Sequence, residues 1–377
     1  MTFILKKYDK IKLSLLMTIL VISAVFVGFT SECFDMKTTV ENSDNSYNQD
    51  KEVVEQGFVS AENDNQIVEN KEEPSKNYYT ELKNEQEKEN IVKEDVKSYA
   101  DEVFTVYDLN SKRDVTLNGF DLVCQIVRNE VGAAYKSGAK KGQTAFHKET
   151  IKAHAVAAYT YVKYNQARGI KASVGLNTDL SDALISYVEE VDGQAIYYNG
   201  QYICAVYTAS TGGTTLSSKY CWGTNTPYLV SVESKHDSKS AQYSATNTMS
   251  AEKVKSIIES ATDIKLSENP ENWFYIAETV DGNYVNKLII DGNSTCSVRG
   301  KNTSINGSVF REQIIGYSNL KSPAFTISYS NGEFIFTSYG YGHGVGMPSE
   351  GAQLYAINDN WSYDQILTHY YTGVNIK

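Results

Sequence analysis

One acidic residue stands where a carboxyl group is able to do acid–base chemistry. Glu130 ends an apolar stretch in which Leu122 and Ile126 recur at helical spacing, and a loop of small residues over 132–142 follows it. Partial burial at such an edge raises the pKa of a carboxyl group, as a general acid at neutral pH requires. A Glu that only caps the helix or faces solvent would fit the same pattern, so Glu130 is a candidate.

Two further candidates are segments of small residues. Residues 340–347 read Gly-Tyr-Gly-His-Gly-Val-Gly-Met, and residues 208–213 read Thr-Ala-Ser-Thr-Gly-Gly. Alternate glycines bring the backbone close to a ligand or to another strand, and no Lys-Ser or Lys-Thr follows them as in a phosphate-binding loop. His343 at the centre would bind, orient or catalyse, or would be a hydrogen-bonded histidine of the core.

The elements that position these residues predict an α+β fold, because helices are grouped among antiparallel hairpins. Apolar spacing, turn residues and Ser or Gly caps give their bounds. We expect helices over 120–129, 150–167, 250–261, 351–357 and 363–368, strands over 103–106 and 114–117, and hairpins over 195–207, 273–290 and 325–337.

Net charge is spread unevenly along the 377 residues. The chain has a formal net charge of −11, and residues 34–103 hold eight Lys and nineteen acidic residues, whereas residues 104–377 hold 23 basic and 25 acidic ones. This composition excludes collagen-like and polytopic membrane proteins and argues against binding to nucleic acid. It predicts three parts: a basic and apolar segment over 1–33, an acidic disordered stalk over 34–103 and a folded domain over 104–377.

The first segment predicts export. Lys6, Lys7, Lys10 and Lys12 precede an apolar run over 13–29, which places the N-terminus inside the cell and the remainder outside. The run fits an uncleaved signal anchor or a cleaved signal peptide, because residues 28–31 offer only a weak cleavage site. We expect a single-pass membrane protein with an extracytoplasmic domain, or a secreted protein if the segment is removed.

Four cysteines, Cys124, Cys204, Cys221 and Cys296, lie in the predicted domain. In an exported domain they allow disulfides, and Cys204 and Cys221 flank the 208–213 turn that a disulfide would close. Buried free thiols are the alternative. The histidines are scattered and no Cys-x-x-Cys spacing occurs, so no metal site is predicted.

Five blocks together resemble the SpoIID/LytB family of cell-wall proteins, in the family's order over roughly 115–377. They are 126–131 (IVRNEV), 151–161 (IKAHAVAAYTY), 207–213 (YTASTGG), 340–347 (GYGHGVGM) and 366–374 (ILTHYYTGV). The departures from the family pattern are His154 and Tyr159 in place of Gln and Arg, Val-Gly after Glu130 in place of Met-Pro, an enlarged loop over 132–149, and Pro-Ser-Glu over 348–350.

The resemblance implies a single large α+β domain that works as a lytic transglycosylase without a cofactor. Such an enzyme cleaves the β-1,4 bond between N-acetylmuramic acid and N-acetylglucosamine in strands stripped of stem peptides. The sugar's own 6-hydroxyl attacks and a 1,6-anhydro ring forms, so one carboxyl group, here Glu130, is expected to suffice.

The resemblance also implies binding residues and partners. The expected substrate contacts are Lys152, Tyr159, Ser210, Thr211, Gly212, Gly213, Tyr341 and His343. The implied partners are peptidoglycan strands, a cell-wall amidase and other membrane sporulation proteins, in engulfment or in cell-wall remodelling. Two alternatives stay open: a non-catalytic glycan-binding amidase enhancer, and a metal hydrolase site built around His343.

Overall fold

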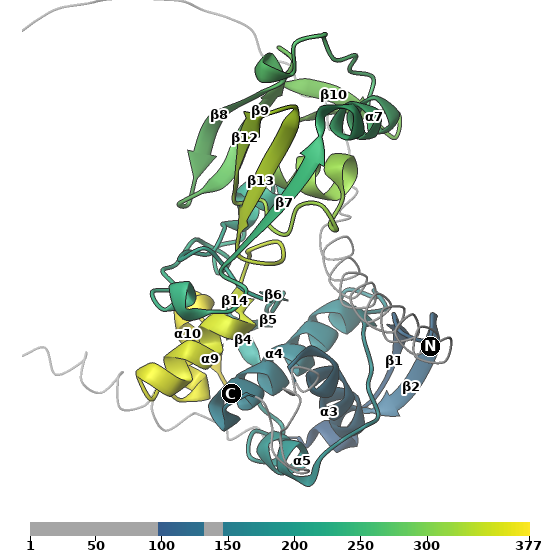
Figure 1. The fold of residues 1–377 in the computed structure, drawn as a ribbon. Helices are drawn as coiled ribbons and strands as arrows, with labels where there is room; N and C mark the ends of the chain where they lie inside the picture. Colours follow the sequence, from purple (N-terminus) through teal and green to yellow (C-terminus); the bar gives the residue numbers. More distant parts are fainter. Residues whose placement is uncertain (1–96, 132–145) are drawn as a thin grey trace, which may run out of the picture. The chain divides into compact units, whose positions relative to one another are not determined.

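The computed structural model describes residues 97–131 and 146–377 (Figure 1). Helices and small, mostly antiparallel sheets alternate along the described chain, which confirms the α+β class. The predicted anchor, nearly all of the predicted stalk and the 132–142 loop lie outside the described residues. Among the residues described, no helix has both the length and the apolar composition that crossing a membrane requires.

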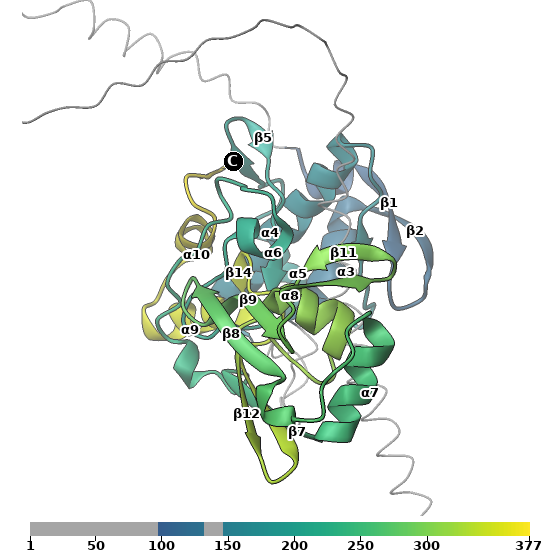
Figure 2. The ribbon, with the colours of Figure 1, turned by 90° about the horizontal axis from the view of Figure 1, so that it is seen from above.

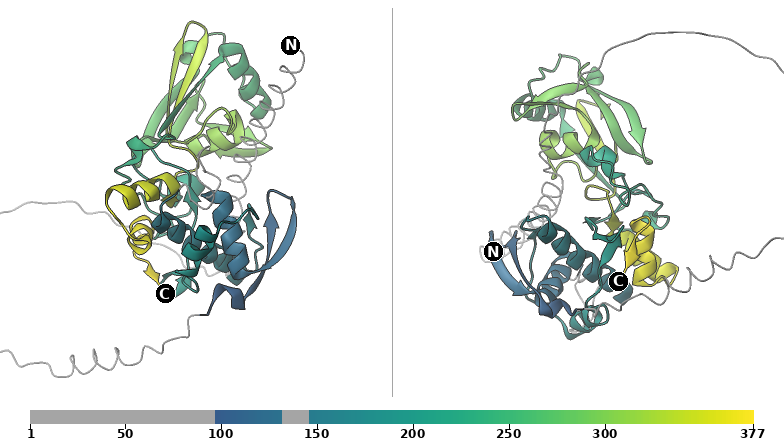
Figure 3. Two further views of the ribbon diagram at one scale, coloured as in Figure 1. Left: turned by 60° about the horizontal axis from the view of Figure 1, so that its bottom comes forward. Right: turned by 180° about the vertical axis from the view of Figure 1, so that it is seen from behind.

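A group of helices forms the first hydrophobic core. Helix α3 (Gly119–Glu130) begins at Asn118, whose side chain accepts from the Asp121 N–H at 2.9 Å. Helix α4 (Lys148–Ala167) is buried on nearly every side because it packs against α3, α5 (Asp182–Glu189), α9 (Ser349–Asn358) and α10 (Tyr363–Tyr370) (Figure 3). All the helices expected in this part of the chain are therefore present.

Short strands complete this core. Strands β1 (Val103–Asp108) and β2 (Arg113–Asn118) pair antiparallel, and β3 (Ser173–Val174) adds to β1 in parallel. Strand β4 (Ile196–Tyr198) pairs with β5 (Gln201–Tyr202) and β15 (Asn375–Ile376). A short helical turn, η1 (Tyr99–Asp101), precedes β1 and its Tyr99 is fully buried. Residues 98–103, which we assigned to the stalk, therefore belong to the folded part.

A second hydrophobic core lies between strands and helix α7 (Ala251–Ala261) (Figure 2). Its three-stranded sheet has the order β12 (Phe325–Ser330), β13 (Glu333–Tyr339), β7 (Ser244–Ser250). The hairpins β8 (Phe274–Val280)–β9 (Tyr284–Ile290) and β10 (Thr295–Val298)–β11 (Lys301–Ser304), the short helix α8 (Gly307–Val309) and the π-helix η5 (Phe310–Ile315) complete this part. Phe274, Phe310 and Phe336 meet edge to face or tilted in the core.

A seam of backbone contacts joins residues 206–211 to residues 340–348. Strand β6 (Tyr207–Thr208) pairs in parallel with β14 (Met347–Pro348), and Ser210 forms a bridge with Tyr341. The expected hairpin over 195–207 is therefore shorter than predicted, because Tyr207 and Thr208 pair with β14 instead. Helix α6 (Ser218–Trp222) follows the seam.

The cysteines do not close the 208–213 turn. Cys124, Cys221 and Cys296 are buried free thiols, and Cys221 Sγ lies 3.5 Å from Ser308 Oγ. Of the two possibilities left open, a Cys204–Cys221 disulfide is excluded because Cys221 is a free thiol, and buried thiols are confirmed for Cys124, Cys221 and Cys296.

Candidate functional site

Glu130 is the last residue of α3 and its side chain is half-buried. Burial raises the pKa of its carboxyl group to about 7, because desolvation disfavours the charged form. One hydrogen bond opposes this shift: Asn129 Nδ2 donates to Glu130 Oε1 at 3.2 Å. The carboxyl group therefore titrates close to neutral pH, as expected of a group that gives and takes a proton.

The amide of Asn129 is held in one orientation. Asn129 Oδ1 accepts from Asn110 Nδ2 at 2.9 Å. Asn110 Nδ2 also donates to the Leu176 carbonyl at 2.9 Å, which fixes the Asn110 amide. Because the oxygen is used in this way, the NH₂ group is left to face Glu130. A Cβ atom at Gly175 would overlap the Asn129 amide, so the glycine makes room for this arrangement.

Tyr207 is electrostatically coupled to Glu130, and the His154 ring packs against Tyr207. Burial and then the charge of Glu130 raise the pKa of Tyr207 well above its usual value. The His154 ring meets the Tyr207 ring edge to face, with centroids 4.9 Å apart, and burial lowers the pKa of His154 to about 3. Neither ring nitrogen of His154 has a hydrogen-bond partner within the described part of the chain. Tyr207, which is electrostatically coupled to Glu130, and its ring neighbour His154 are therefore both uncharged at neutral pH.

The glycine-rich block approaches another strand, one of the two possibilities that its pattern allows. Gly342 has φ +116°, and a Cβ there would overlap Thr208 Oγ1. His343 is fully buried: its Nδ1 accepts from the Val345 N–H at 3.0 Å, so its Nε2 carries the proton and donates to the Tyr207 carbonyl at 3.0 Å. Burial and then Arg311 lower its pKa to about 3. His343 is therefore an uncharged residue that stabilises the seam, and its ring nitrogens do not support the predicted substrate contact because both are used within the fold.

The hydroxyl-rich turn is also interior. Ser210 Oγ donates to the Gln242 carbonyl at 2.9 Å, and Thr211 Oγ1 donates to Asp237. Asp237 also accepts from the Gly213 N–H at 3.4 Å, while Gly212 lies against Tyr339 without room for a Cβ. Both hydroxyl-bearing residues are buried, Ser210 to 1 % and Thr211 to 0 % exposure. Their placement supports a role in holding the turn and does not support the predicted sugar contacts.

Two residues of α4 expected at the site are used elsewhere. Lys152 Nζ pairs with Glu149 at 3.1 Å and with Glu190, and no described contact links it to Glu130. Tyr159 is buried against Tyr99, and its hydroxyl donates to Glu102 at 3.1 Å. A charged contact from Lys152 to substrate or to Glu130 is therefore not supported, because its charge is already neutralised within the fold.

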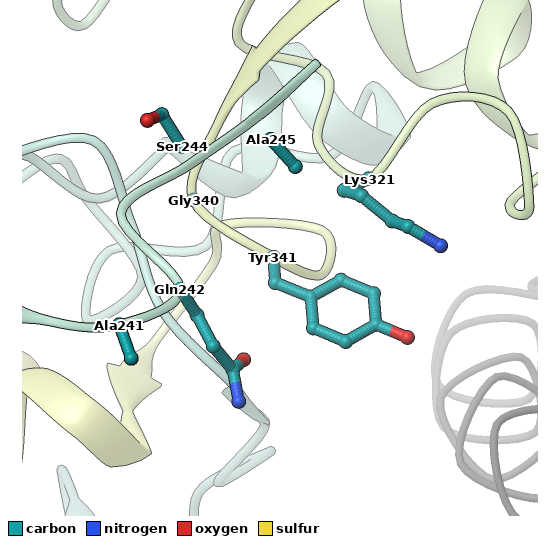
Figure 4. A pocket seen from close by; sticks show the side chains of 7 residues that line it. All are labelled: Ala241, Gln242, Ser244, Ala245, Lys321, Gly340 and Tyr341. Carbon is teal, nitrogen blue, oxygen red and sulfur yellow. The ribbon is translucent and has the colours of Figure 1, made fainter. Parts of the chain in front are cut away.

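Tyr341 is the predicted binding residue that lines an open hollow. A pocket of about 380 Å³ is bounded by Ala241, Gln242, Ser244, Ala245, Lys321, Gly340 and Tyr341 (Figure 4). Glu130 is not among these residues. The seam links the two places, because Thr208, the neighbour of Tyr207, donates its hydroxyl to the Tyr341 carbonyl at 3.2 Å.

Sequence reasoning missed Asn129, Asn110 and Lys321. Asn129 stands in the matched block over 126–131, but its orientation depends on Asn110, 19 residues earlier in the chain. The spacing of Asn110 and Lys321 does not mark them, because their roles come from contacts between distant segments. Two other residues could be found from the sequence: Tyr207 begins the block over 207–213 that resembles the family, and His154 departs from the family pattern. In the residues that the structure describes, no three His, Cys, Asp or Glu side chains gather where they would hold a metal ion.

Comparison with known proteins gives three relatives and no matching family model. Amidase enhancer of Bacillus subtilis (strain 168) is 27% identical over 274 residues, which cover 60% of this chain and 38% of that protein. Stage II sporulation protein D is 29% identical over 190 residues in B. subtilis and 28% identical over 190 residues in Bacillus amyloliquefaciens, with 50% of this chain covered in each case. The chain spans 38% to 50% of the length of these relatives.

Proposed function

These relatives support the assignment of the chain to the SpoIID/LytB family, and from that premise we propose that it is a peptidoglycan lytic transglycosylase with Glu130 as its catalytic residue. The names of the relatives support a sporulation-related role at the cell wall. The proposed reaction, the cleavage of glycan strands between N-acetylmuramic acid and N-acetylglucosamine, goes beyond those names.

The observation that carries the proposal is the pKa of about 7 that burial gives the Glu130 carboxyl group. At neutral pH both the protonated and the ionised form are populated, so the acid form is available to protonate the glycosidic oxygen as the C–O bond breaks. The resulting carboxylate then takes the proton of the sugar's 6-hydroxyl while that oxygen bonds to the anomeric carbon. The carboxyl group returns to its starting state, and no water is consumed.

The decisive test replaces the carboxyl group by an amide. Glu130→Gln keeps the size of the side chain but cannot transfer a proton, so release of 1,6-anhydro ends should fall by about 10²- to 10⁴-fold. The measurement is mass spectrometry of products from peptide-stripped murein. Glu268→Gln, at an almost fully exposed side chain, is the matched control and should retain full activity. Undiminished release by Glu130→Gln would reject the proposal.

A second candidate is a glycan-binding enhancer of an amidase. One observation favours it: the similarity to the amidase enhancer covers 60% of this chain. The same variant separates the two functions. An enhancer should still stimulate a cell-wall amidase when it carries Glu130→Gln, and neither form should release anhydro products.

We also propose that the domain works outside the cytoplasmic membrane, on peptidoglycan strands and next to an amidase. The support is the row of Lys6, Lys7, Lys10 and Lys12 before the apolar run over 13–29. Protease added to intact protoplasts should digest the domain if this placement is right and spare it otherwise.

A further inference from the structure

The pocket beside Tyr341 has the features of a ligand site. Tyr341 and Lys321 project side by side from neighbouring loops, and Lys321 Nζ lies 5.5 Å from the centre of the Tyr341 ring (Figure 4). Both side chains are half-buried, and the Gln242 side chain extends from a third segment. The hollow of about 380 Å³ is large enough for one sugar ring.

The ammonium group of Lys321 differs from the other buried or half-buried lysines. Lys152 and Lys163 are each paired with carboxylates. No carboxylate in the described part of the chain pairs with Lys321. A cation that is partly removed from water without an acidic partner is unfavourable, and an anion supplied from outside would relieve it.

A second cationic side chain, Arg311, lies next to Lys321 but has a carboxylate of its own. The buried Arg311 donates through Nε to the Lys321 carbonyl at 3.1 Å, and its Nη1 lies 3.5 Å from Glu312. Burial and then Arg311 lower the pKa of Lys321. Glu312 offsets the charge of Arg311, so among the described residues Lys321 keeps a charge without a carboxylate partner.

We infer that the pocket between Tyr341 and Lys321 is a subsite for a sugar residue that bears an anionic substituent. The tyrosine ring offers a flat surface to the apolar face of a sugar, the ammonium pairs with the anion, and the Gln242 amide reaches hydroxyl or acetamido groups. The inference rests on the proposed function, because it names the part of a glycan strand that binds away from Glu130.

The chemistry of the substituent discriminates between glycan strands. Muramic acid without a stem peptide carries a free lactyl carboxylate, whereas a stem peptide converts that group to an amide. A lysine at the subsite therefore favours stripped strands. A sugar phosphate from a different polymer also carries a negative charge that pairs with Lys321. The experiment therefore includes both a sugar carboxylate and a sugar phosphate.

The test measures binding by titration calorimetry to the full-length chain carrying Glu130→Gln, which prevents turnover. The probes are N-acetylmuramic acid, N-acetylglucosamine and N-acetylglucosamine 6-phosphate. We expect an acidic sugar to bind about tenfold more tightly than neutral N-acetylglucosamine, since a charge-assisted hydrogen bond is added. Added salt should weaken the binding of the acidic sugar and leave that of the neutral sugar unchanged.

Lys321→Gln should abolish the preference for the acidic sugars over N-acetylglucosamine, and Tyr341→Ala should weaken the binding of all three probes. The matched control is Lys219→Gln: Lys219 Nζ also lies over a tyrosine ring, 5.2 Å from the centre of Tyr220, but outside the pocket. A preference for N-acetylmuramic acid assigns the site to stripped murein, and a preference for the phosphate assigns it to a phosphorylated polymer.

Equal, salt-independent binding of all probes, or a preference that survives Lys321→Gln, would overturn the inference. The outcome is separate from that of the proposed function. If Glu130→Gln leaves glycan cleavage unchanged, the transglycosylase proposal fails, whereas the subsite is judged only by the binding preference.

Discussion

The end of α3 and the glycine-rich seam both hold polar groups away from water, but they satisfy them differently. At the seam, His343 uses both ring nitrogens and Asp237 accepts from Thr211 and Gly213. At the end of α3, the Glu130 carboxyl group has one described donor, Asn129 at 3.2 Å.

The difference separates structure from chemistry. A buried polar group with all its partners stabilises one conformation and has no capacity left for a ligand. A carboxyl group with too few donors keeps a raised pKa and exchanges its proton near neutral pH. We therefore expect Glu130 to lower the stability of the fold and to favour reaction. We expect the seam to raise the stability of the fold and to take no part in the reaction.

The largest expected effect comes from breaking the seam. Gly342→Ala forces a left-handed residue with a side chain onto Thr208 Oγ1, so the free energy of unfolding should fall by about 3–5 kcal/mol. Urea unfolding followed by circular dichroism measures it. Gly223→Ala is the matched control, because Gly223 has φ +79° and nothing within 4 Å, and it should lose only about 1 kcal/mol. Equal losses in the two variants would mean that the seam is not tightly packed.

The next effect is at Glu130 and has the opposite sign. The folded-state pKa of about 7 lies above the ordinary value of 4.5, so the folded protein binds the proton more tightly and loses stability as pH rises between these values. Glu130→Gln removes that loss and should be more stable than the parent by about 2–3 kcal/mol at pH 8. At pH 4, below both pKa values, the two proteins should unfold at nearly the same urea concentration. The other titrating groups are common to both proteins and cancel in the comparison. A variant that is less stable than the parent at pH 8 would contradict the assigned burial.

Local patterns predicted the elements that carry these two regions. The Asn199-Gly200 turn has φ +50° and +76°, as a primed hairpin turn requires, and Ser250 caps α7 as expected. The apolar periodicity that placed Glu130 at a helix end was sufficient, because it depends only on neighbours in the sequence. Strand β7 was missed, since its polar residues resemble a loop and its pairing with β13 is set by a segment about 90 residues away.

The sequence did not predict which side chains the polar residues pair with in the folded protein. Lys152 lies in a block that suggests a ligand contact, yet Glu190 on the following helical segment neutralises it. Lys321 has no carboxylate partner among the residues that the structure describes, and its sequence neighbours do not set it apart. Thr211 finds Asp237, 26 residues further on, by the folding of the seam. Whether a polar residue is free or used is a property of tertiary contacts, and spacing alone does not report it.

The smallest expected effect tests the single donor at the α3 end. Asn129→Ala removes a hydrogen bond that favours the ionised carboxyl group, so the pKa of Glu130 should rise further, by about 0.5–1 unit. Carbon-13 NMR of side-chain-labelled glutamate measures it, with the Glu130 resonance identified by its loss in Glu130→Gln. Asn286→Ala, which removes a 2.8 Å bond to the exposed Glu278, is the control and should leave Glu130 unchanged. If the pKa of Glu130 stays the same in Asn129→Ala, the hydrogen bond from Asn129 does not affect that pKa, and desolvation alone raises it. A fall in the pKa would instead show that the Asn129 amide presents its oxygen to the carboxyl group, contrary to the bond from Asn110 that fixes its orientation.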